Sequence, residues 1–247
     1  MATIIFCLPS YTQQVFQKEV DSLHVKLNKE KDKAIPKSKF SFKMKNKKPK
    51  EKKEEEKVEA EVETDIFDLI DDKTDFVVKQ RTGEKLVFSE NEYEGKDKVY
   101  LINIEDCDIY LPFSMKALYI KNTVNSRVYA GYVEGASFFN STENSTYHVA
   151  SHQTRIHWAK NCDFYIFAKQ GPIIEDCSSV RFGPYMFKYP NSSKHEQKSG
   201  FANSKNMYFK VTDFKWLKKD KSPNYDIISE EELKDKTDIV LEEGDFK

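Results

Sequence analysis

The sequence predicts an all-β protein whose main domain is a parallel β-helix, in which short strands stack coil upon coil. From about residue 66, short aromatic and β-branched runs alternate with small polar residues, a pattern typical of a chain of short strands. One four-residue unit, a turn residue followed by an apolar strand residue, recurs with its first residues 19, 19, 17 and 16 positions apart. A further apolar strand precedes each unit. The units are Asp106–Ile109, Asn125–Val128, Asn144–Tyr147, Asn161–Phe164 and Cys177–Val180.

The repeat length favours a β-helix over other folds. A period of 16 to 19 residues is too short for a strand–helix–strand unit, which needs about 30 residues, and too long for a hairpin. One β-helix coil fits, because successive coils stack about 4.8 Å apart and bury a common apolar column. An antiparallel sandwich is the alternative, but it requires reversed patterns in alternate hairpins.

The remaining segments differ in composition from this domain. Apolar residues recur at helical spacing from Phe16 to Leu27, which predicts an N-terminal helix. Nine lysines and one glutamate in residues 37–53 precede six glutamates and one lysine in residues 54–63, and such charge blocks predict a disordered linker. We expect four segments: a short helical segment (1–33), a charged disordered linker (34–64), the β-helix domain (65–225) and a solvated acidic tail (226–247).

Composition excludes several classes of function. No apolar run approaches the roughly 18 residues of a membrane-spanning helix, and we expect neither a secretory leader nor a membrane partner. The four cysteines lack zinc-site spacing, which predicts buried free thiols and no metal. No phosphate-binding Gly-rich loop is present, so we expect no nucleotide-hydrolysing site and no bound cofactor. The lysine block has no matching basic surface in the folded region, which argues against nucleic-acid binding.

The segment Gln153–His157 holds the candidate site residues. Period-two alternation places Gln153, Arg155 and His157 on one face of a strand and the intervening residues on the other. A strand that buries an isoleucine and holds an arginine outward suits a guanidinium offered to a partner. The guanidinium is always charged, planar and forked, and therefore fits negative charge on phosphate oxygens. For a lone arginine, a solvated surface side chain is the ordinary alternative.

Two further features lie near this strand. Glu175 follows Arg155 by 20 residues, about one coil, so we expect its carboxylate to orient the guanidinium through a charge-assisted hydrogen bond. A purely structural ion pair is the alternative. Tyr165 and Phe167, on the next strand, either widen an interface around Arg155 or lie under a terminal segment.

Three spaced motifs resemble the C-CAP/cofactor C-like domain family over about residues 82–190. They are Gln153-Thr154-Arg155-Ile156-His157, Pro172-Ile173-Ile174-Glu175-Asp176-Cys177 and Phe182-Gly183-Pro184-Tyr185. The ending Asp213-Phe214-Lys215-Trp216-Leu217, followed by Ser222-Pro223-Asn224-Tyr225, is similar to that of the cofactor C branch.

The resemblance implies a right-handed parallel β-helix that activates GTP hydrolysis on another protein. In the cofactor C branch, which serves as a chaperone of tubulin folding, that protein is β-tubulin, held in an assembly with cofactors D and E. The family's arginine finger corresponds to Arg155, and its supporting residues correspond to Gln153 and Glu175. His152 stands where relatives often have glutamine and receives no role. The resemblance further implies a monomeric, cytoplasmic, cytoskeleton-associated protein that is no enzyme itself, since the partner binds the GTP.

Three other functions remain open from the residues. One is activation of an Arf-like small GTPase, since a relative of that kind shares the Gln-x-Arg pattern. Another is a non-catalytic cytoskeleton-binding module of the same fold. The third, a polysaccharide-cleaving β-helix enzyme, lacks a pair of outward carboxylates in this sequence.

Overall fold

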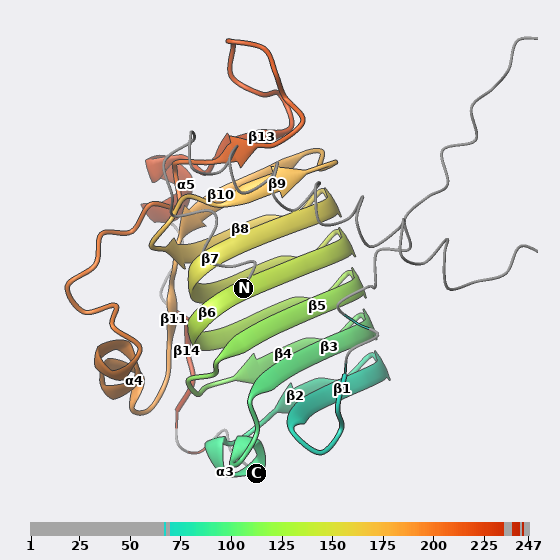
Figure 1. Ribbon diagram of the computed structural model, residues 1–247, viewed down its shortest axis with the longest axis vertical. Helices are drawn as coiled ribbons and strands as arrows, with labels where there is room; N and C mark the ends of the chain where they lie inside the picture. Colours follow the sequence, from blue (N-terminus) through green and yellow to red (C-terminus); the bar gives the residue numbers. More distant parts are fainter. Residues whose placement is uncertain (1–66, 68–69, 235–238, 243, 245–247) are drawn as a thin grey trace, which may run out of the picture. The chain divides into compact units, whose positions relative to one another are not determined.

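The structure is a computed structural model that describes residue 67, residues 70–234, residues 239–242 and residue 244. The predicted N-terminal helix in residues 1–33 and the charged linker of residues 34–64 lie outside these residues and stay predictions. The described chain forms a stack of strands from β1 (Asp75–Thr82) at one end to β13 (Tyr225–Ile227) at the other (Figure 1).

Two ladders of parallel strands run along this stack, and the chain alternates between them. All pairings between described strands are parallel, which confirms the β-helix and excludes the antiparallel sandwich. The first ladder comprises β1, β3 (Lys98–Glu105), β5 (Ala117–Val124), the second halves of β6 (Arg127–Glu143) and β7 (Thr146–Lys160), β9 (Ile173–Glu175) and β12 (Thr212–Asp213). The second ladder comprises β2 (Lys85–Val87), β4 (Asp108–Leu111), the first halves of β6 and β7, β8 (Asp163–Ala168), β10 (Val180–Pro184) and β13.

The turns from the first ladder to the second follow the predicted repeat, with one correction. Each turn has a residue of positive φ, a conformation that Asn and Asp tolerate better than most residues do. In the fifth unit, Ser178 bridges to Lys160, so Ser179 takes the place of Asn161 and the last spacing is 18 (179 minus 161). The expected spacing of 16, counted from Cys177, was therefore wrong. The five positive-φ turn residues are Asp106, Asn125, Asn144, Asn161 and Ser179.

Both ladders share one apolar core. In the first ladder, one inward column runs through five neighbouring strands, and its side chains have no exposed surface. Burial of each contributes about 1.5–3 kcal/mol. Three of the four cysteines are buried free thiols, as predicted, and burial raises the pKa of the Cys177 thiol to about 11. The column consists of Leu101, Ile120, Phe139, Ile156 and Ile174.

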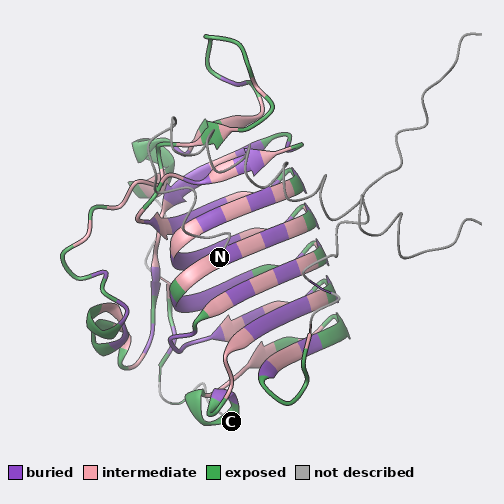
Figure 2. Ribbon diagram, in the orientation of Figure 1, coloured by how far each residue is buried: buried purple, intermediate pink, exposed green. Residues whose placement is uncertain are grey.

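The outer face of the second ladder is covered by the chain that follows β10. There, β11 (Phe187–Lys188) pairs with β14 (Ile239–Val240), close to α4 (Ser192–Lys198). The return segment and the ladder form an apolar cluster. Figure 2 shows how far each stacked strand is buried. The members of this covering cluster are Tyr129, Tyr132, Ala150, Phe187, Tyr189, Phe201 and Leu241.

This cover corrects one expectation and decides between two alternatives for Tyr165 and Phe167. Part of the acidic segment after Asp226 is packed, because Ile228 and Leu241 are apolar and only 2% and 4% exposed. The expected solvated tail was therefore wrong for these residues. Tyr165 is 2% exposed and Phe167 packs against the covering cluster, so both lie beneath other side chains and not in an interface. Two short helices, α3 (Glu90–Tyr93) and α5 (Glu230–Lys234), complete the fold.

No helix among the described residues is long and apolar enough to cross a membrane.

Candidate functional site

The second half of β7 carries the predicted site residues on the outer face of the first ladder. The predicted alternation is confirmed, since Thr154 and Ile156 are 2% and 0% exposed, whereas Gln153, Arg155 and His157 are half-buried. Ile156 anchors the strand in the inward column, which fixes the direction of its neighbour Arg155. The structure therefore holds the guanidinium at the surface of the solenoid.

Buried hydroxyl groups support the bend of the chain just before Arg155. β7 passes from the second ladder to the first near Ser151, whose Oγ lies 2.8 Å from both Ser137 Oγ and Thr154 Oγ1. The same hydroxyl donates to the carbonyl oxygen of Gln153 at 3.0 Å. Because buried hydrogen-bond networks restrict local geometry, this hydroxyl cluster fixes the backbone from which Gln153 and Arg155 project. Sequence reasoning missed these small residues, which have no individual signature.

Apolar side chains flank Arg155 along its column. The register places Phe138 beside it on one strand and Ile173 on the other. Further along, Tyr100 and Tyr119 stack at 4.8 Å, and Phe67 lies across Tyr100, Tyr119 and Phe138 at 6.2–6.3 Å. Burial raises the pKa of Tyr100 to about 12. Low-dielectric neighbours strengthen the interaction of a cation with an anionic ligand, so this position suits an arginine that meets phosphate charge.

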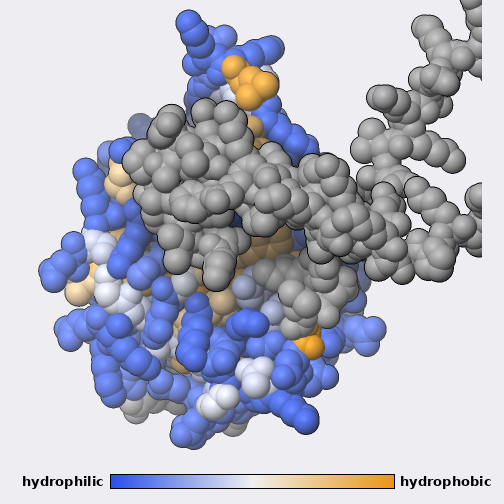
Figure 3. Space-filling view, in the orientation of Figure 1, coloured by the Kyte–Doolittle hydropathy of each residue, from blue (hydrophilic) through white to orange (hydrophobic). Residues whose placement is uncertain are grey.

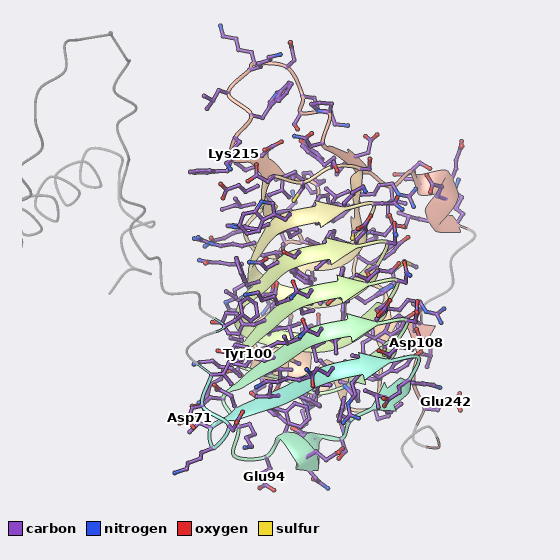
Figure 4. The ribbon with its side chains drawn as sticks, turned by 90° about the vertical axis from the view of Figure 1, so that its right-hand side faces the viewer. Asp71, Glu94, Tyr100, Asp108, Lys215 and Glu242 are labelled. Carbon is purple, nitrogen blue, oxygen red and sulfur yellow. The ribbon has the colours of Figure 1, made fainter. Side chains whose placement is uncertain are left out.

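Glu175 does not take the expected place beside Arg155. The register pairs Glu175 with His157 and puts Ile173 next to Arg155, because the coil is 18 residues long here and not 20. The carboxylate lies 3.6 Å from His157 Nε2 and 3.2 Å from Lys215 Nζ. Lys215 also contacts Asp176 at 2.5 Å, and both carboxylates raise the pKa of its ammonium group. Glu175 thus connects the strand of Arg155 with the end of the first ladder, near Lys215 in Figure 4.

Trp158 is a neighbour that the sequence reasoning missed. The residue is 55% exposed, and its ring meets that of His157 edge-on at 5.9 Å. Its φ is +52°, which is rare for a bulky residue. Its register neighbours on the adjoining strands, Ser141 and Asp176, share the positive φ but are small or polar. The backbone therefore does not explain a tryptophan here.

His152 has contacts of its own. Its Nε2 lies 2.9 Å from the carbonyl oxygen of Ser199, and its ring packs edge-on against Phe201 at 4.9 Å. These contacts tie β7 to the segment after α4, which is a structural role.

The described residues hold no cluster of three or more side chains suited to a metal ion. The outer face around Arg155 offers one forked cation, an amide, and a carboxylate held by two basic groups. Side chains of these kinds are suited to binding an anion.

Comparison with known proteins gives consistent matches. Residues 96–214 match the family described as Tubulin binding cofactor C. The chain is 34% identical over 229 residues to "Tubulin-folding cofactor C" of Arabidopsis thaliana, covering 92% of this chain and 66% of the relative. It is 33% identical over 135 residues to "Tubulin-specific chaperone C" of Homo sapiens, covering 54% and 39%. A solved structure, "Tubulin Binding Cofactor C from Leishmania major", matches with a TM-score of 0.47 and 27% identity, covering 54% of this chain and 90% of that one. The chain spans about two thirds of the plant relative and about two fifths of the human one.

Proposed function

This chain belongs to the tubulin binding cofactor C family, and on that premise we propose that it is a tubulin-folding cofactor that stimulates GTP hydrolysis by β-tubulin. In this proposal it acts in an assembly with cofactors D and E and releases native tubulin heterodimer. The names of the plant and human relatives connect those proteins with tubulin. The single observation that supports the mechanism is the position of Arg155, half-buried on the outer face of a rigid solenoid.

We assign Arg155 the role of an arginine finger. Its guanidinium enters the nucleotide site of the partner and neutralises charge that develops as the γ-phosphoryl group is transferred. Gln153 and Glu175 have supporting roles: Gln153 projects from the same face, and Glu175 fixes the neighbouring His157. Under this proposal the protein is no enzyme by itself and binds no cofactor, since the GTP belongs to the partner. It works as a cytoplasmic, cytoskeleton-associated monomer.

Removal of the guanidinium tests the proposal. An arginine supplied in trans accelerates hydrolysis by roughly 10³- to 10⁵-fold, which equals about 4–7 kcal/mol of barrier. We expect Arg155→Ala to abolish the stimulated GTP turnover of tubulin with cofactors D and E. Arg155→Lys should fail as well, because an ammonium group lacks the planar fork.

Arg81→Ala is the matched control for this experiment. Arg81 lies on β1 of the same ladder, four strands from β7, or about 19 Å away, and its partner is Glu84. It should leave turnover unchanged. If the Arg155→Ala variant stimulated GTP turnover as strongly as the wild-type chain, the finger assignment would be contradicted. Stimulation of an Arf-like GTPase but not of tubulin would favour the alternative partner.

A further inference from the structure

The loop after β12, residues 214–221, projects beyond the last strands of the first ladder (Figure 1). Phe214 is 66% exposed and Leu217 is 93% exposed, the two highest values among the large hydrophobic residues that the structure describes. Figure 3 shows hydrophobic atoms on this loop surrounded by hydrophilic ones. Single exposed apolar residues are common on protein surfaces, so the exposure alone decides nothing.

The loop is held in place by specific hydrogen bonds. At its base, Asp213 Oδ2 accepts from Ser222 Oγ at 2.6 Å and from Asn224 Nδ2 at 2.7 Å. Within it, Trp216 Nε1 donates to the carbonyl oxygen of Asp220 at 2.7 Å. A loop closed in this way keeps Leu217 at its tip without apolar contacts that would bury it. The fixed exposure of an apolar residue indicates an interaction surface, because ordering it for another molecule in advance lowers the entropy cost of binding.

The charge of the loop specifies the partner. Four lysines stand against one aspartate, a net charge of +3 (4 minus 1). Two of them, Lys215 and Lys221, pair with carboxylates of this chain, so the outward positive charge is that of Lys218 and Lys219. Lys218 Nζ lies 4.9 Å from the centre of the Trp216 ring, and Lys219 is exposed. A basic surface with apolar anchors matches an acidic protein surface with an apolar depression, because complementary potentials steer association and buried apolar anchors supply the affinity.

The loop lies at the same edge of the solenoid as Arg155. The backbone N–H of Phe214 donates to the carbonyl oxygen of Ile174 at 2.9 Å, and Lys215 binds Glu175, which in turn contacts His157. β9 therefore separates the loop's base from the strand of Arg155, a distance of two strand spacings or about 10 Å. Trp158, 55% exposed and with a φ of +52°, lies on β7 itself, three residues after Arg155 and in register with Asp176.

We propose that Trp158, Phe214 and Leu217, together with Lys218 and Lys219, form a docking rim that binds an acidic face of the same protein on which Arg155 acts. This inference rests on the proposed function. In this arrangement the docking rim supplies binding energy and orientation, and Arg155 supplies the charge needed in the transition state. The two roles have separate kinetic consequences, because binding made equally before and during reaction changes the concentration dependence and not the maximal rate.

The experiment measures tubulin GTP turnover against tubulin concentration in the presence of cofactors D and E. The double variant Phe214→Ser/Leu217→Ser should raise the tubulin concentration needed for half-maximal stimulation by about tenfold or more, with an unchanged maximal rate. Charge reversal, Lys218→Glu/Lys219→Glu, should act in the same direction, and added salt should weaken the wild type. Val240→Ser is the matched control, since Val240 is 59% exposed but lies on β14, in the cover of the second ladder.

Each outcome of this experiment is informative. Absence of stimulation by the wild-type chain overturns the proposed function. Stimulation that depends on Arg155 but is unchanged in both loop variants overturns the docking rim alone. The same holds if the loop variants lower the maximal rate without a change in half-maximal concentration, or if Val240→Ser has an equal effect.

An anionic membrane is the competing partner for a basic, apolar loop. Sedimentation with phosphatidylserine vesicles tests it, and we expect the wild-type chain to stay in the supernatant. The docking rim would be overturned in favour of a lipid surface by the following result: the wild-type chain sediments with the vesicles, the Phe214→Ser/Leu217→Ser variant does not, and both stimulate tubulin equally. Because all substituted side chains are exposed, thermal unfolding should be unaffected, which separates loss of contact from loss of fold.

Discussion

The two ladders share one core, yet their outer faces differ. The second ladder is covered by the chain's own return segment, whose aromatic and aliphatic side chains form the covering cluster. The first ladder, around β7, presents half-buried Gln153, Arg155 and His157 beside exposed Trp158. The inward-facing side chains of both ladders are mostly apolar and buried, so the two ladders differ only in their outer faces. In this solenoid, the core and the covered outer face hold the fold, and the residues that we propose for recognition lie on the other outer face.

Neighbouring residues on opposite faces of β7 give the sharpest test of this separation. Ile156→Ala should lower the free energy of unfolding by about 3 kcal/mol, because it leaves a cavity in a filled column. Arg155→Ala, one residue away, should change it by less than about 1 kcal/mol. Urea unfolding of both variants measures the difference. Equal destabilisation would mean that Arg155 is part of the fold's support, and the comparison between the faces would fail.

The cover of the second ladder predicts the next largest effect. Leu241 is 4% exposed in the covering cluster, whereas its neighbour Val240 is 59% exposed. Leu241→Ala should cost about 2 kcal/mol, and Val240→Ala less than about 0.5 kcal/mol. The measurement is the urea concentration at the midpoint of unfolding, compared between variants whose unfolding free energy depends on urea with the same slope. If Leu241→Ala were neutral, Leu241 would add nothing to the stability of the fold, and its burial would not count against the expected solvated tail.

The same contrast explains what the sequence predicted and what it did not. The inward columns and the Asn turns repeat, because every coil must solve the same packing and backbone problem, so the fold and the outward direction of Arg155 followed from pattern alone. The partner of Glu175 did not follow, since coil length varies and a difference of two residues moves a side chain from Arg155 to His157. The burial of Leu241 was not predicted either, because the acidic composition of a segment says little about two or three apolar residues within that segment.

Trp158 was not predicted because no sequence pattern marks it as an exposed residue of positive φ. Its substitution is expected to have the smallest effect on stability. On the first ladder, the positions in register with it are Gln80, Asn103, Asn122, Ser141 and Asp176, all with positive φ. Asparagine tolerates this conformation better than tryptophan does, so Trp158→Asn should raise the free energy of unfolding by about 1 kcal/mol.

The reciprocal change, Asn122→Trp, is the matched control and should cost a similar amount at an equivalent position of another coil. Both are measured by urea unfolding. The stabilised Trp158→Asn variant should also need more tubulin for half-maximal stimulation, since a residue kept at a cost to the fold is kept for binding. A variant that is more stable and binds equally well would remove Trp158 from the docking rim, and a less stable one would show that the indole ring packs against β7 strongly enough to offset the backbone strain.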